Sequence, residues 1–385
     1  MIKISIYKRL FTIYTIIGKT FGQWFSPIIT GFLLLILRIT VFISSIIDMF
    51  FYSKIRNGKI NNPIVIVGNP RSGTTFLHHY LTSHKLGTGS QLWQMLYPSV
   101  LIQKILRPFL PILEKISPTR HHSTDAHKTS LQSVETDDAS ILFRYLDGFF
   151  LYGFLLSWHK HNLFDWVDPK KRDTSERDFN WLESMWLRVL VSNNEKQIIG
   201  KLFSISANMP KFLKRFPEAK ILYMVRDPLS VIPSGLSLVT GVLDKKFGFW
   251  SLDQTKRDRY IKRLYGALIE LIKRFHEDWS SGKIDKNKVM IVNFDRMMND
   301  FDGLMKDIVN FIDVEPTEDL INDIKITSEK QRKFKSKHKY DLDKFGLTEQ
   351  QIIEDCDFIY KSFLNKNNNF NICYYYFTLC KNTTI

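Results

Sequence analysis

The segment Pro63–Leu81, "PIVIVGNPRSGTTFLHHYL", constrains the fold more than any other part of the sequence. Four apolar β-branched residues, Ile64–Val67, predict a buried strand. Gly68 and Gly73 then bracket a turn, after which Thr74–Ser83 has the apolar spacing of a helix. A glycine-bracketed turn between a strand and a helix directs backbone N–H groups and the positive end of the helix dipole at one place. The segment therefore predicts an anion-binding loop.

This loop departs from the ATP/GTP-binding pattern at one position. The pattern G-x-x-x-x-G-K-[ST] uses its lysine to reach the outer phosphates. Here Thr74 stands at the lysine position, and Arg71 is the only cation inside the loop. Ser72, Thr74 and Thr75 add hydroxyl donors. The loop therefore suits a single 5′-phosphate carrying another small acid group better than a triphosphate with Mg²⁺.

Short β-branched runs alternate with helical patterns along the chain. The runs are Ile64–Val67, Gln197–Lys201, Ile221–Val225 and Val289–Asn293. The helical patterns cover Thr74–Ser83, Gln91–Leu106, Val134–Leu156, Met209–Phe216, Leu229–Val239, Arg257–Ser280, Phe301–Phe311 and Glu349–Phe363. This alternation predicts an α/β fold with a parallel sheet flanked by helices, as in P-loop NTPases. The long helical stretch before Gln197 is expected to be an insert that selects the substrate.

A second segment, "VRDPLSVIPS", adds another candidate anion site. Arg226 follows the strand Ile221–Val225 directly, at the end where doubly wound sheets bind ligands. Ser234 comes eight residues later, on the helix that follows. The two side chains are suited to clamp a second, separate phosphate. Taken alone, a strand-end pair such as Arg226 and Asp227 is more often a structural ion pair, and only together with the unusual loop is it interpreted as a phosphate site.

Composition favours an anionic ligand and argues against nucleic-acid-binding, disulfide and metal sites. The formal net charge of +15 suits an anionic ligand or an anionic membrane surface, whereas the chain lacks the long Lys/Arg blocks of a nucleic-acid-binding tail. We therefore expect no nucleic-acid partner. Three cysteines without CxxC spacing argue against a disulfide framework and structural zinc. His121, His122 and His127 lack helical ligand spacing, so no metal site is expected.

The N-terminal region contains an apolar segment, Ile28–Ile47, with Arg38 as its only charge. Twenty residues are enough to cross a bilayer, but a central arginine costs about 2.5–3.5 kcal/mol on insertion scales. The segment is therefore interpreted as a spanning helix, a membrane-surface helix or a docked core helix. The expected division is an N-terminal helical segment (1–60), a catalytic domain (61–364) and a tail (365–385), and the protein is expected to be membrane-associated or cytoplasmic.

The two segments resemble a known family. "GNPRSGTT" and "VRDPLSVIPS" are similar to the two cofactor signatures of sulfotransferases, which use 3′-phosphoadenosine 5′-phosphosulfate (PAPS). The resemblance runs from about Pro63 to Phe345 and is greatest to the branch with tyrosylprotein and many bacterial lipid- or small-molecule-directed enzymes. It implies a P-loop-like sulfotransferase domain that moves a sulfuryl group from PAPS to an acceptor hydroxyl without a metal.

The resemblance also implies roles for individual residues. The residues implied to hold the 5′-phosphosulfate are Arg71, Ser72, Gly73, Thr74 and Thr75, and those implied to hold the 3′-phosphate are Arg226 and Ser234. Arg71 is the expected stabiliser of charge on the leaving phosphate, and Lys201, which ends its predicted strand, is the second expected catalytic cation. A solvated strand-end lysine is the alternative for Lys201.

The general base is less clear from the sequence. Related enzymes often carry a glutamate in the segment that matches "SQLWQMLYPS", but this chain has Gln94 there, and an amide cannot accept the proton. Glu135 and Asp138, three residues apart and expected on one helix face, are the next candidates, and Glu135 is preferred. Acidic residues that open a helix also favour its dipole without any catalytic role. His127 is a weaker rival.

Two other functions and the nature of the acceptor remain open at this level. The first alternative is a kinase-like P-loop enzyme, and the second is a membrane-bound binding protein of the same fold without catalysis, which Gln94 keeps open. The apolar N-terminus and the aromatic-rich insert favour an apolar or amphipathic, lipid-like acceptor, although such aromatics are common in cores. The basic stretch Arg332–Lys339 is interpreted as a solvated charge run or a cover over the bound cofactor.

Overall fold

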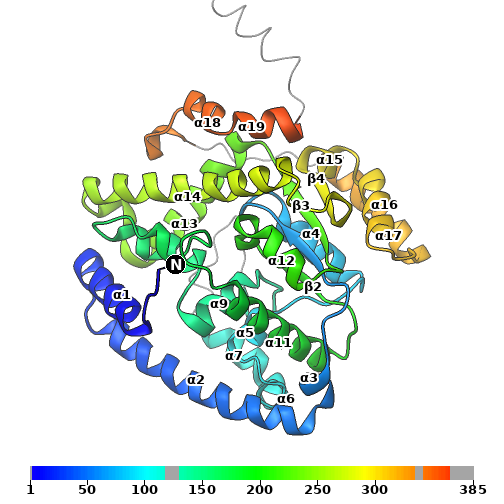
Figure 1. Ribbon diagram of the computed structural model, residues 1–385, viewed down its shortest axis with the longest axis horizontal. Helices are drawn as coiled ribbons and strands as arrows, with labels where there is room; N and C mark the ends of the chain where they lie inside the picture. Colours follow the sequence, from blue (N-terminus) through cyan, green and yellow to red (C-terminus); the bar gives the residue numbers. More distant parts are fainter. Residues whose placement is uncertain (1, 118–129, 334–340, 365–385) are drawn as a thin grey trace, which may run out of the picture.

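A computed structural model describes residues 2–117, 130–333 and 341–364 of the chain (Figure 1). Within these residues a parallel sheet has the strand order β2-β1-β3-β4. The strands are β1 (Ile64–Val67), β2 (Ile199–Lys201), β3 (Lys220–Val225) and β4 (Val289–Asn293). Val65 pairs with Gly200 on one side and with Ile221 on the other. The predicted parallel sheet flanked by helices is confirmed.

Helices cover both faces of the sheet because its strands are apolar on both sides. Ile64 and Ile66 pack in one cluster, and Val65 and Val67 pack in the other, as the two-residue period of a strand requires. The first face is covered by α4 (Thr74–Ser83), α15 (Phe294–Asn299), α16 (Phe301–Phe311) and α17 (Glu318–Lys333). The second is covered by α11 (Ser175–Asn193), α12 (Met209–Arg215), α13 (Pro228–Phe247) and α14 (Gln254–Ser280).

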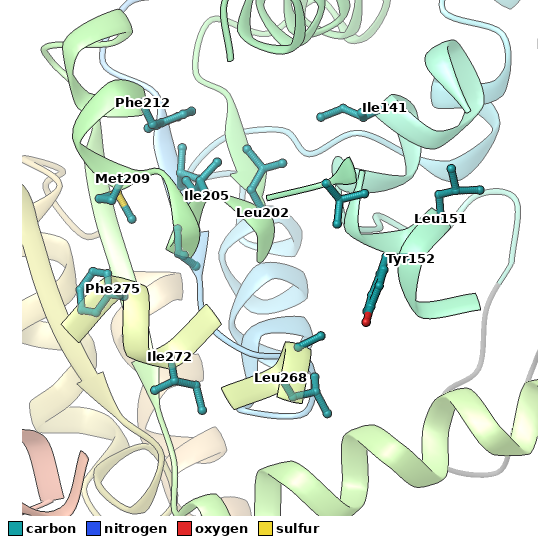
Figure 2. Packing of buried hydrophobic residues seen from close by; sticks show 14 of the residues in the cluster. Ile141, Leu151, Tyr152, Leu202, Ile205, Met209, Phe212, Leu268, Ile272 and Phe275 are labelled. Atoms are coloured by element: carbon teal, nitrogen blue, oxygen red, sulfur yellow. The ribbon is translucent and has the colours of Figure 1, made fainter. Parts of the chain in front are cut away.

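The larger cluster also joins the sheet to the segment between β1 and β2. Figure 2 shows Phe212 of α12 and Leu268 of α14 in one apolar layer with Ile141 and Tyr152 from that segment. The segment is mostly helical in its described residues, as expected. Its elements include α5 (Leu92–Leu96), α6 (Val100–Leu106), η1 (Arg107–Phe109), α7 (Leu110–Ile116), α9 (Asp138–Tyr145), α10 (Phe149–Phe154), η2 (Leu156–Trp158), η3 (Phe164–Trp166) and α11.

Two helices expected in this segment are broken in the structure. The expected helix Gln91–Leu106 is split into α5 and α6, because Ser99 adopts an extended conformation and its hydroxyl caps α6. The expected helix Val134–Leu156 is split into α9 and α10 at Leu146 and Gly148, which have φ of 48° and 88°. A residue in the left-handed conformation ends an α-helix. The apolar periodicity of the sequence continues through these residues, so it does not reveal the break.

The C-terminal helices lie beyond α14 in Figure 1 and close over the start of α13. The Tyr360 hydroxyl donates to Asp227 Oδ1 at 2.6 Å. The remaining short elements after β2 are η4 (Ser204–Ala207), η5 (Phe249–Ser251), η6 (Lys286–Lys288), η7 (Asp343–Phe345), α18 (Glu349–Asp355), α19 (Asp357–Ile359) and η8 (Tyr360–Leu364). The expected single helix Glu349–Phe363 is therefore divided, and the expected tail (365–385) lies outside the described residues.

The N-terminal region forms α1 (Ile6–Phe21), α2 (Ser26–Phe51) and α3 (Ser53–Asn57). Gly22 ends α1 with a left-handed φ of 69°. The helix α2 contains the whole expected apolar segment and runs along the lower edge of the molecule in Figure 1. The proposed domain boundary near residue 60 stays a prediction.

Candidate active site

The glycine-bracketed loop lies where the order of the strands changes direction. From β1 the chain places β2 on one side and β3 on the other, so the carboxyl ends of β1 and β3 form the switch point at which open α/β sheets bind ligands. The loop follows β1, Arg226 follows β3 and Lys201 ends β2. The sheet therefore brings the sequence-predicted residues of all three segments to one edge.

Close packing explains both glycines of the loop. A Cβ on Gly68 would lie 2.7 Å from the Met224 carbonyl oxygen, and a Cβ on Gly73 would lie 2.7 Å from Met297 Cε. Both residues also have positive φ, 143° and 98°. Arg71 shares this property with a φ of 77°, an uncommon conformation for a residue with a side chain, which costs of order 1–3 kcal/mol and is concentrated at functional sites.

Ser72 braces the loop from inside. Its backbone N–H and its hydroxyl both donate to the Asn69 carbonyl, at 3.1 and 2.8 Å, and its side chain is buried. Asn69 in turn donates through Nδ2 to the Leu268 carbonyl of α14 at 2.9 Å. The loop is thereby fixed to a helix on the second face of the sheet. The expected contact of Ser72 with the cofactor stays a prediction.

Arg71 joins the two sequence motifs directly. Its Nε–H donates to the Ser234 hydroxyl at 2.9 Å, and Arg226 Nη1 donates to the Arg71 carbonyl at 2.9 Å. Ser234 is 3% exposed, so its hydroxyl is held at the base of the site. Arg71, Ser234 and Arg226 form a connected group, although more than 150 residues separate the first from the other two.

Further contacts hold the Arg226 motif in place. The Arg226 guanidinium lies 4.0 Å from the centre of the Phe294 ring, a cation–π contact. Asp227 caps α13 by accepting the Leu229 N–H at 3.0 Å. Phe294 was not identified from the sequence, although it follows β4 directly, as Arg226 follows β3, so the strand-end rule would have found it.

Lys201 points into the same site from the end of β2. Its Nζ donates to Thr75 Oγ1 at 3.3 Å and lies 3.9 Å from Glu135 Oε2. Lys201 is 6% exposed, which contradicts a solvated strand-end lysine. Burial lowers the pKa of Lys201, although the charges of Glu135 and the two neighbouring aspartates oppose the shift.

The predicted pairing of Glu135 and Asp138 on one helix face is wrong. Glu135 precedes α9, which begins at Asp138. The Asp138 carboxylate accepts the N–H groups of Phe203 and Ser204 at 2.8 and 3.3 Å, so it anchors the chain after β2. Burial raises the pKa of Asp138. Helix geometry cannot apply here because residue 135 lies before the helix begins.

Glu135 lies differently, beside the cation of the site. Its Oε1 accepts the Ser133 hydroxyl at 2.9 Å, and its other oxygen faces Lys201. Asp137, next in the chain, is engaged by the Lys201 backbone N–H at 3.0 Å, and burial raises its pKa to about 6. Of these three carboxylates, Glu135 is therefore the one whose side chain lies against the Lys201 ammonium.

Gln94 has a structural role. Its Oε1 accepts the Gln91 N–H at 3.1 Å and completes a capping box at the start of α5. Its Nε2 donates to Asn193 Oδ1 at 3.0 Å, and the side chain is fully buried. The amide at this position, where related enzymes often have glutamate, therefore holds α5 and α11 together. Glu135 reaches the site from the neighbouring segment, where its backbone N–H donates to the Ser90 carbonyl.

His78 lies behind Lys201 and was not identified from the sequence. It is fully buried on α4, and its Nε2–H donates to the Ile199 carbonyl at 2.9 Å, since a carbonyl can only accept. Burial and the Lys201 charge lower the pKa of His78 to about 3, so this imidazole is neutral. His78 follows Thr74 by one helical turn, so the periodicity of the predicted helix could have placed it on the same face as the loop.

A cavity of about 540 Å³ borders the Glu135 side of the site. Ser133, which donates to Glu135, lines it together with His79, Gln91 and Val134. Its lining combines hydroxyl, amide and imidazole groups with the rings of Phe76 and Tyr80, which suits an amphipathic molecule.

Other sequence candidates lie elsewhere. His121, His122 and His127 lie outside the described residues, as does most of Arg332–Lys339. Arg332 itself pairs with Asp302 at 2.9 Å on the face that α16 and α17 cover. Among residues 2–117, 130–333 and 341–364, no group of three or more His, Cys, Asp or Glu side chains is arranged to hold a metal ion.

Known proteins similar to this chain were found by sequence and by structure. The model of the Sulfotransferase family matches residues 63–319. The omega-hydroxy-beta-dihydromenaquinone-9 sulfotransferases Stf3 of Mycobacterium bovis and Mycobacterium tuberculosis are each 22% identical over 250 residues, which are 63% of this chain and 61% of the relative. The match thus spans less than two thirds of the length of these curated relatives.

Two solved structures share the fold over most of the chain. Sulfotransferase STF1 from Mycobacterium tuberculosis H37Rv has a TM-score of 0.68 and 16% identity, covering 91% of this chain and 90% of that chain. Sulfotransferase STF9 from Mycobacterium avium has a TM-score of 0.64 and 15% identity, covering 83% and 81%. Since the family model matches more than half of the sequence, including the loop and the Arg226 motif, this chain belongs to the sulfotransferase family.

Proposed function

We propose that the protein is a sulfotransferase that moves the sulfuryl group of PAPS to the hydroxyl of an apolar or amphipathic acceptor. The observation that carries the proposal is the connected group of Arg71, Ser234 and Arg226, which unites two motifs at one edge of the sheet. A protein that binds one phosphate needs one of these motifs, whereas a donor with a 5′-phosphosulfate and a 3′-phosphate needs both.

The chemistry of the donor set fits this co-substrate. The start of α4 offers backbone N–H groups and the hydroxyls of Thr74 and Thr75 to the 5′ side, and the helix dipole favours an anion there. Lys201 adds positive charge on that side through its contact with Thr75. Arg71 belongs to the same loop and reaches the second motif as well, because its Nε–H donates to Ser234. Arg226 adds a guanidinium at the neighbouring strand end for the 3′-phosphate.

Each catalytic side chain then has a separate task. PAPS supplies an activated sulfuryl group, and adenosine 3′,5′-bisphosphate (PAP) is the leaving product. Arg71 and Lys201 stabilise the negative charge that gathers on the leaving phosphate. Glu135 accepts the proton of the acceptor hydroxyl while the new S–O bond forms and the S–O bond to the phosphate breaks. The cavity beside Ser133 supports an approach of the acceptor from the Glu135 side.

The aromatic residues of the insert do not support a lipid-like acceptor. Two of them, Tyr152 and Trp158, are buried in the main core, where they serve packing. The Stf3 relatives are named for a hydroxylated menaquinone derivative, which supports a hydroxyl on an apolar molecule as the acceptor here. A membrane surface is the corresponding place to find it.

Calorimetric titration separates this function from the kinase-like alternative. We expect PAP to bind without a metal and ATP with Mg²⁺ to bind much more weakly, because Thr74 replaces the lysine that reaches outer phosphates. Binding of ATP–Mg²⁺ alone would contradict the proposal. Turnover of PAPS with any hydroxyl acceptor would exclude a binding protein without catalysis.

Arg226→Ala is expected to weaken PAP binding by about 1.5–3 kcal/mol, the range for charge-assisted hydrogen bonds. Binding of adenosine 5′-phosphosulfate, which lacks the 3′-phosphate, should fall much less. The remaining loss for that ligand reports the hydrogen bond from Arg226 to the Arg71 carbonyl. Titration calorimetry with both ligands checks this, and equal losses would mean that Arg226 only supports the loop.

Lys201→Met is expected to lower turnover by about 10²–10³-fold, since one preorganised donor to developing charge is lost. Methionine fills similar volume in the buried site, and Lys201→Arg should recover part of the loss. The measurement is single-turnover transfer from labelled PAPS at saturating donor. A loss confined to PAP affinity, with normal single-turnover rates, would assign Lys201 to binding only.

A further inference from the structure

The N-terminal helices expose a large apolar surface. On α2, Phe32 and Ile29 are 62% exposed, and Phe50 is 77% exposed. The large apolar residues exposed on α1, the α1–α2 turn and α2 are Tyr7, Leu10, Phe11, Trp24, Phe25, Ile28, Ile29, Phe32, Leu33, Leu35, Ile36, Ile39, Phe42, Ile43, Ile46, Met49, Phe50 and Phe51. We call these residues the N-terminal apolar surface. Isolated exposed apolar residues are ordinary, but contiguous ones mark a binding surface.

The opposite side of α2 is fixed to the protein. Arg38, Val41, Ser44 and Asp48 follow one another at intervals of three and four residues, so they share one face of the helix. Arg38 Nη2 donates to the Phe143 carbonyl at 3.2 Å. Asp48 is fully buried and accepts the first N–H groups of α6 at 2.9 and 3.0 Å. A helix with one polar, docked face and one exposed apolar face is not surrounded by lipid.

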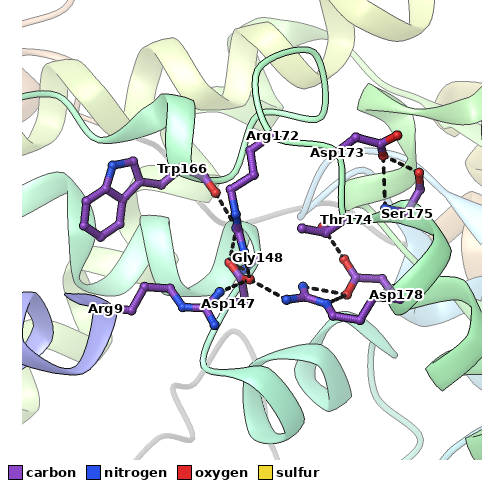
Figure 3. A network of polar contacts seen from close by, with 10 residues as sticks. Arg9, Asp147, Gly148, Trp166, Arg172, Asp173, Thr174, Ser175 and Asp178 are labelled. Carbon is purple, nitrogen blue, oxygen red and sulfur yellow. Dashed lines mark hydrogen bonds and ion pairs between the residues drawn. The ribbon is translucent and has the colours of Figure 1, made fainter. Parts of the chain in front are cut away.

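The helix α1 is fixed as well. Arg9 pairs with the buried carboxylate of Asp147, which also accepts Arg172 at 2.7 Å and Arg177 at 3.0 Å (Figure 3). The α1–α2 unit is thus attached at Arg9, Arg38 and Asp48. Releasing it to cross a bilayer would break buried ion pairs, which is strongly unfavourable.

Charge around the surface favours one kind of partner. Lys54, Arg56 and Lys59 are exposed just after α2, and Lys19 is exposed before it. Residues 1–117 contain two acidic side chains, and both are used internally. Asp48 caps α6, and Glu114 accepts the Leu131 N–H at 2.9 Å. Basic residues at both ends of an apolar face match anionic lipid headgroups over an acyl layer.

We infer that the N-terminal apolar surface docks the protein on the anionic leaflet of a phospholipid bilayer, with α2 lying in the plane of the interface. This attachment does not depend on the reaction. A link between docking and catalysis rests on the proposed function and runs through α9. The first residue of α9, Asp138, adjoins the Lys201 site, and the Phe143 carbonyl of the same helix accepts a hydrogen bond from Arg38. Helix α9 has eight residues, about 12 Å, so the docked face of α2 is separated from the Glu135 segment by one short helix.

Vesicle flotation of the full-length protein tests the docking. We expect binding to phosphatidylcholine vesicles that contain phosphatidylserine and weaker binding to phosphatidylcholine alone. The double variant Ile28→Glu/Ile39→Glu should reduce the bound fraction at least about tenfold. The matched control Ile321→Glu/Ile326→Glu changes two exposed isoleucines on α17 and should bind normally.

Reversing the charges that flank α2 isolates the electrostatic contribution to vesicle binding. Lys54→Glu/Arg56→Glu/Lys59→Glu should abolish the preference for phosphatidylserine, because each basic residue near the surface contributes to attraction. PAP affinity, measured on the same samples, should stay unchanged in every variant. Absent PAP binding in the wild type would count against the proposed function alone and leave the docking result valid.

Depth measurements distinguish an in-plane helix from a spanning one. Residues 28, 39 and 50 are all exposed and eleven apart, about three turns, so they share a face. Spin labels at these positions, in a Cys373→Ser/Cys380→Ser background that keeps the buried Cys356, should report equal shallow depths. Greatest depth at residue 39 would overturn the inference, as would unchanged binding by the Ile28/Ile39 variant. So would a lipid-free dimer that does not float, since a second copy would then cover the surface.

Discussion

Glu135→Gln is expected to lower turnover by about 10²–10⁴-fold, the range for loss of a general base, with PAP affinity unchanged. The substitution keeps the size of the side chain and its acceptance of the Ser133 hydroxyl while removing its ability to take a proton. The site is otherwise preserved, because Lys201 still donates to Thr75. Single-turnover transfer from labelled PAPS to an acceptor measures the effect.

Neighbouring carboxylates provide the controls. Asp138→Asn should mainly lower the free energy of unfolding, since Asp138 accepts the N–H groups of Phe203 and Ser204. Its single-turnover rate at low temperature should remain near normal. If Glu135→Gln keeps near-normal turnover while His127→Asn loses it, the base is His127. If neither variant matters, the acceptor hydroxyl ionises without help from either side chain.

Local patterns predicted the sheet and the loop because they depend on near neighbours. The run Ile64–Val67 and the helix Thr74–Ser83 have the predicted bounds, since apolar period and glycine positions decide both. Arg226 was placed at the sheet edge by the rule for carboxyl ends of parallel strands. Lys201 was identified from its position in the family that the sequence resembles, and in the structure it ends β2 at the same edge.

Other parts of the site depend on contacts that a single sequence does not contain. The hydrogen bond between Arg71 and Ser234 joins residues 163 positions apart, and nothing in either motif specifies it. The burial of Gln94 against Asn193 of α11 likewise depends on tertiary packing. The break between α9 and α10 was hidden because apolar spacing continues through Leu146, whose left-handed conformation only the fold explains.

The N-terminal helix α2 is a further case in which the sequence predicted the element but not its contacts. Composition identified Ile28–Ile47 as apolar enough to span a bilayer, and the structure has one helix of that length and hydropathy among its described residues. From the sequence, Arg38 was considered only as a charge that makes insertion into a bilayer unfavourable. In the structure its hydrogen bond to the Phe143 carbonyl places it on the docked face of α2, so Arg38 helps to fix the orientation of this helix.

Asp147→Ala is expected to lower the free energy of unfolding by about 3–5 kcal/mol, because removing one partner leaves buried charge uncompensated. The Asp147 side chain is 3% exposed and faces three guanidinium groups, those of Arg9, Arg172 and Arg177. Urea unfolding at neutral pH measures the loss. Glu277→Ala, which breaks an exposed ion pair with Lys170, is the control and should cost at most about 1 kcal/mol.

The same carboxylate predicts a dependence on pH. Burial alone would raise the pKa of Asp147, but the hydrogen bonds from Arg172 and the charges of Arg172, Arg9 and Arg177 outweigh it and lower the pKa below the ordinary 3.8. The group therefore stabilises the fold fully above pH 3.8, and this contribution is lost as the pH falls through the lower pKa of the folded state. Asp147→Asn should unfold more easily at neutral pH and show a shallower loss of stability on acidification. Parallel acid-induced losses in the variant and the wild type would mean that other carboxylates, and not the one binding α1 to the insert, control unfolding in acid.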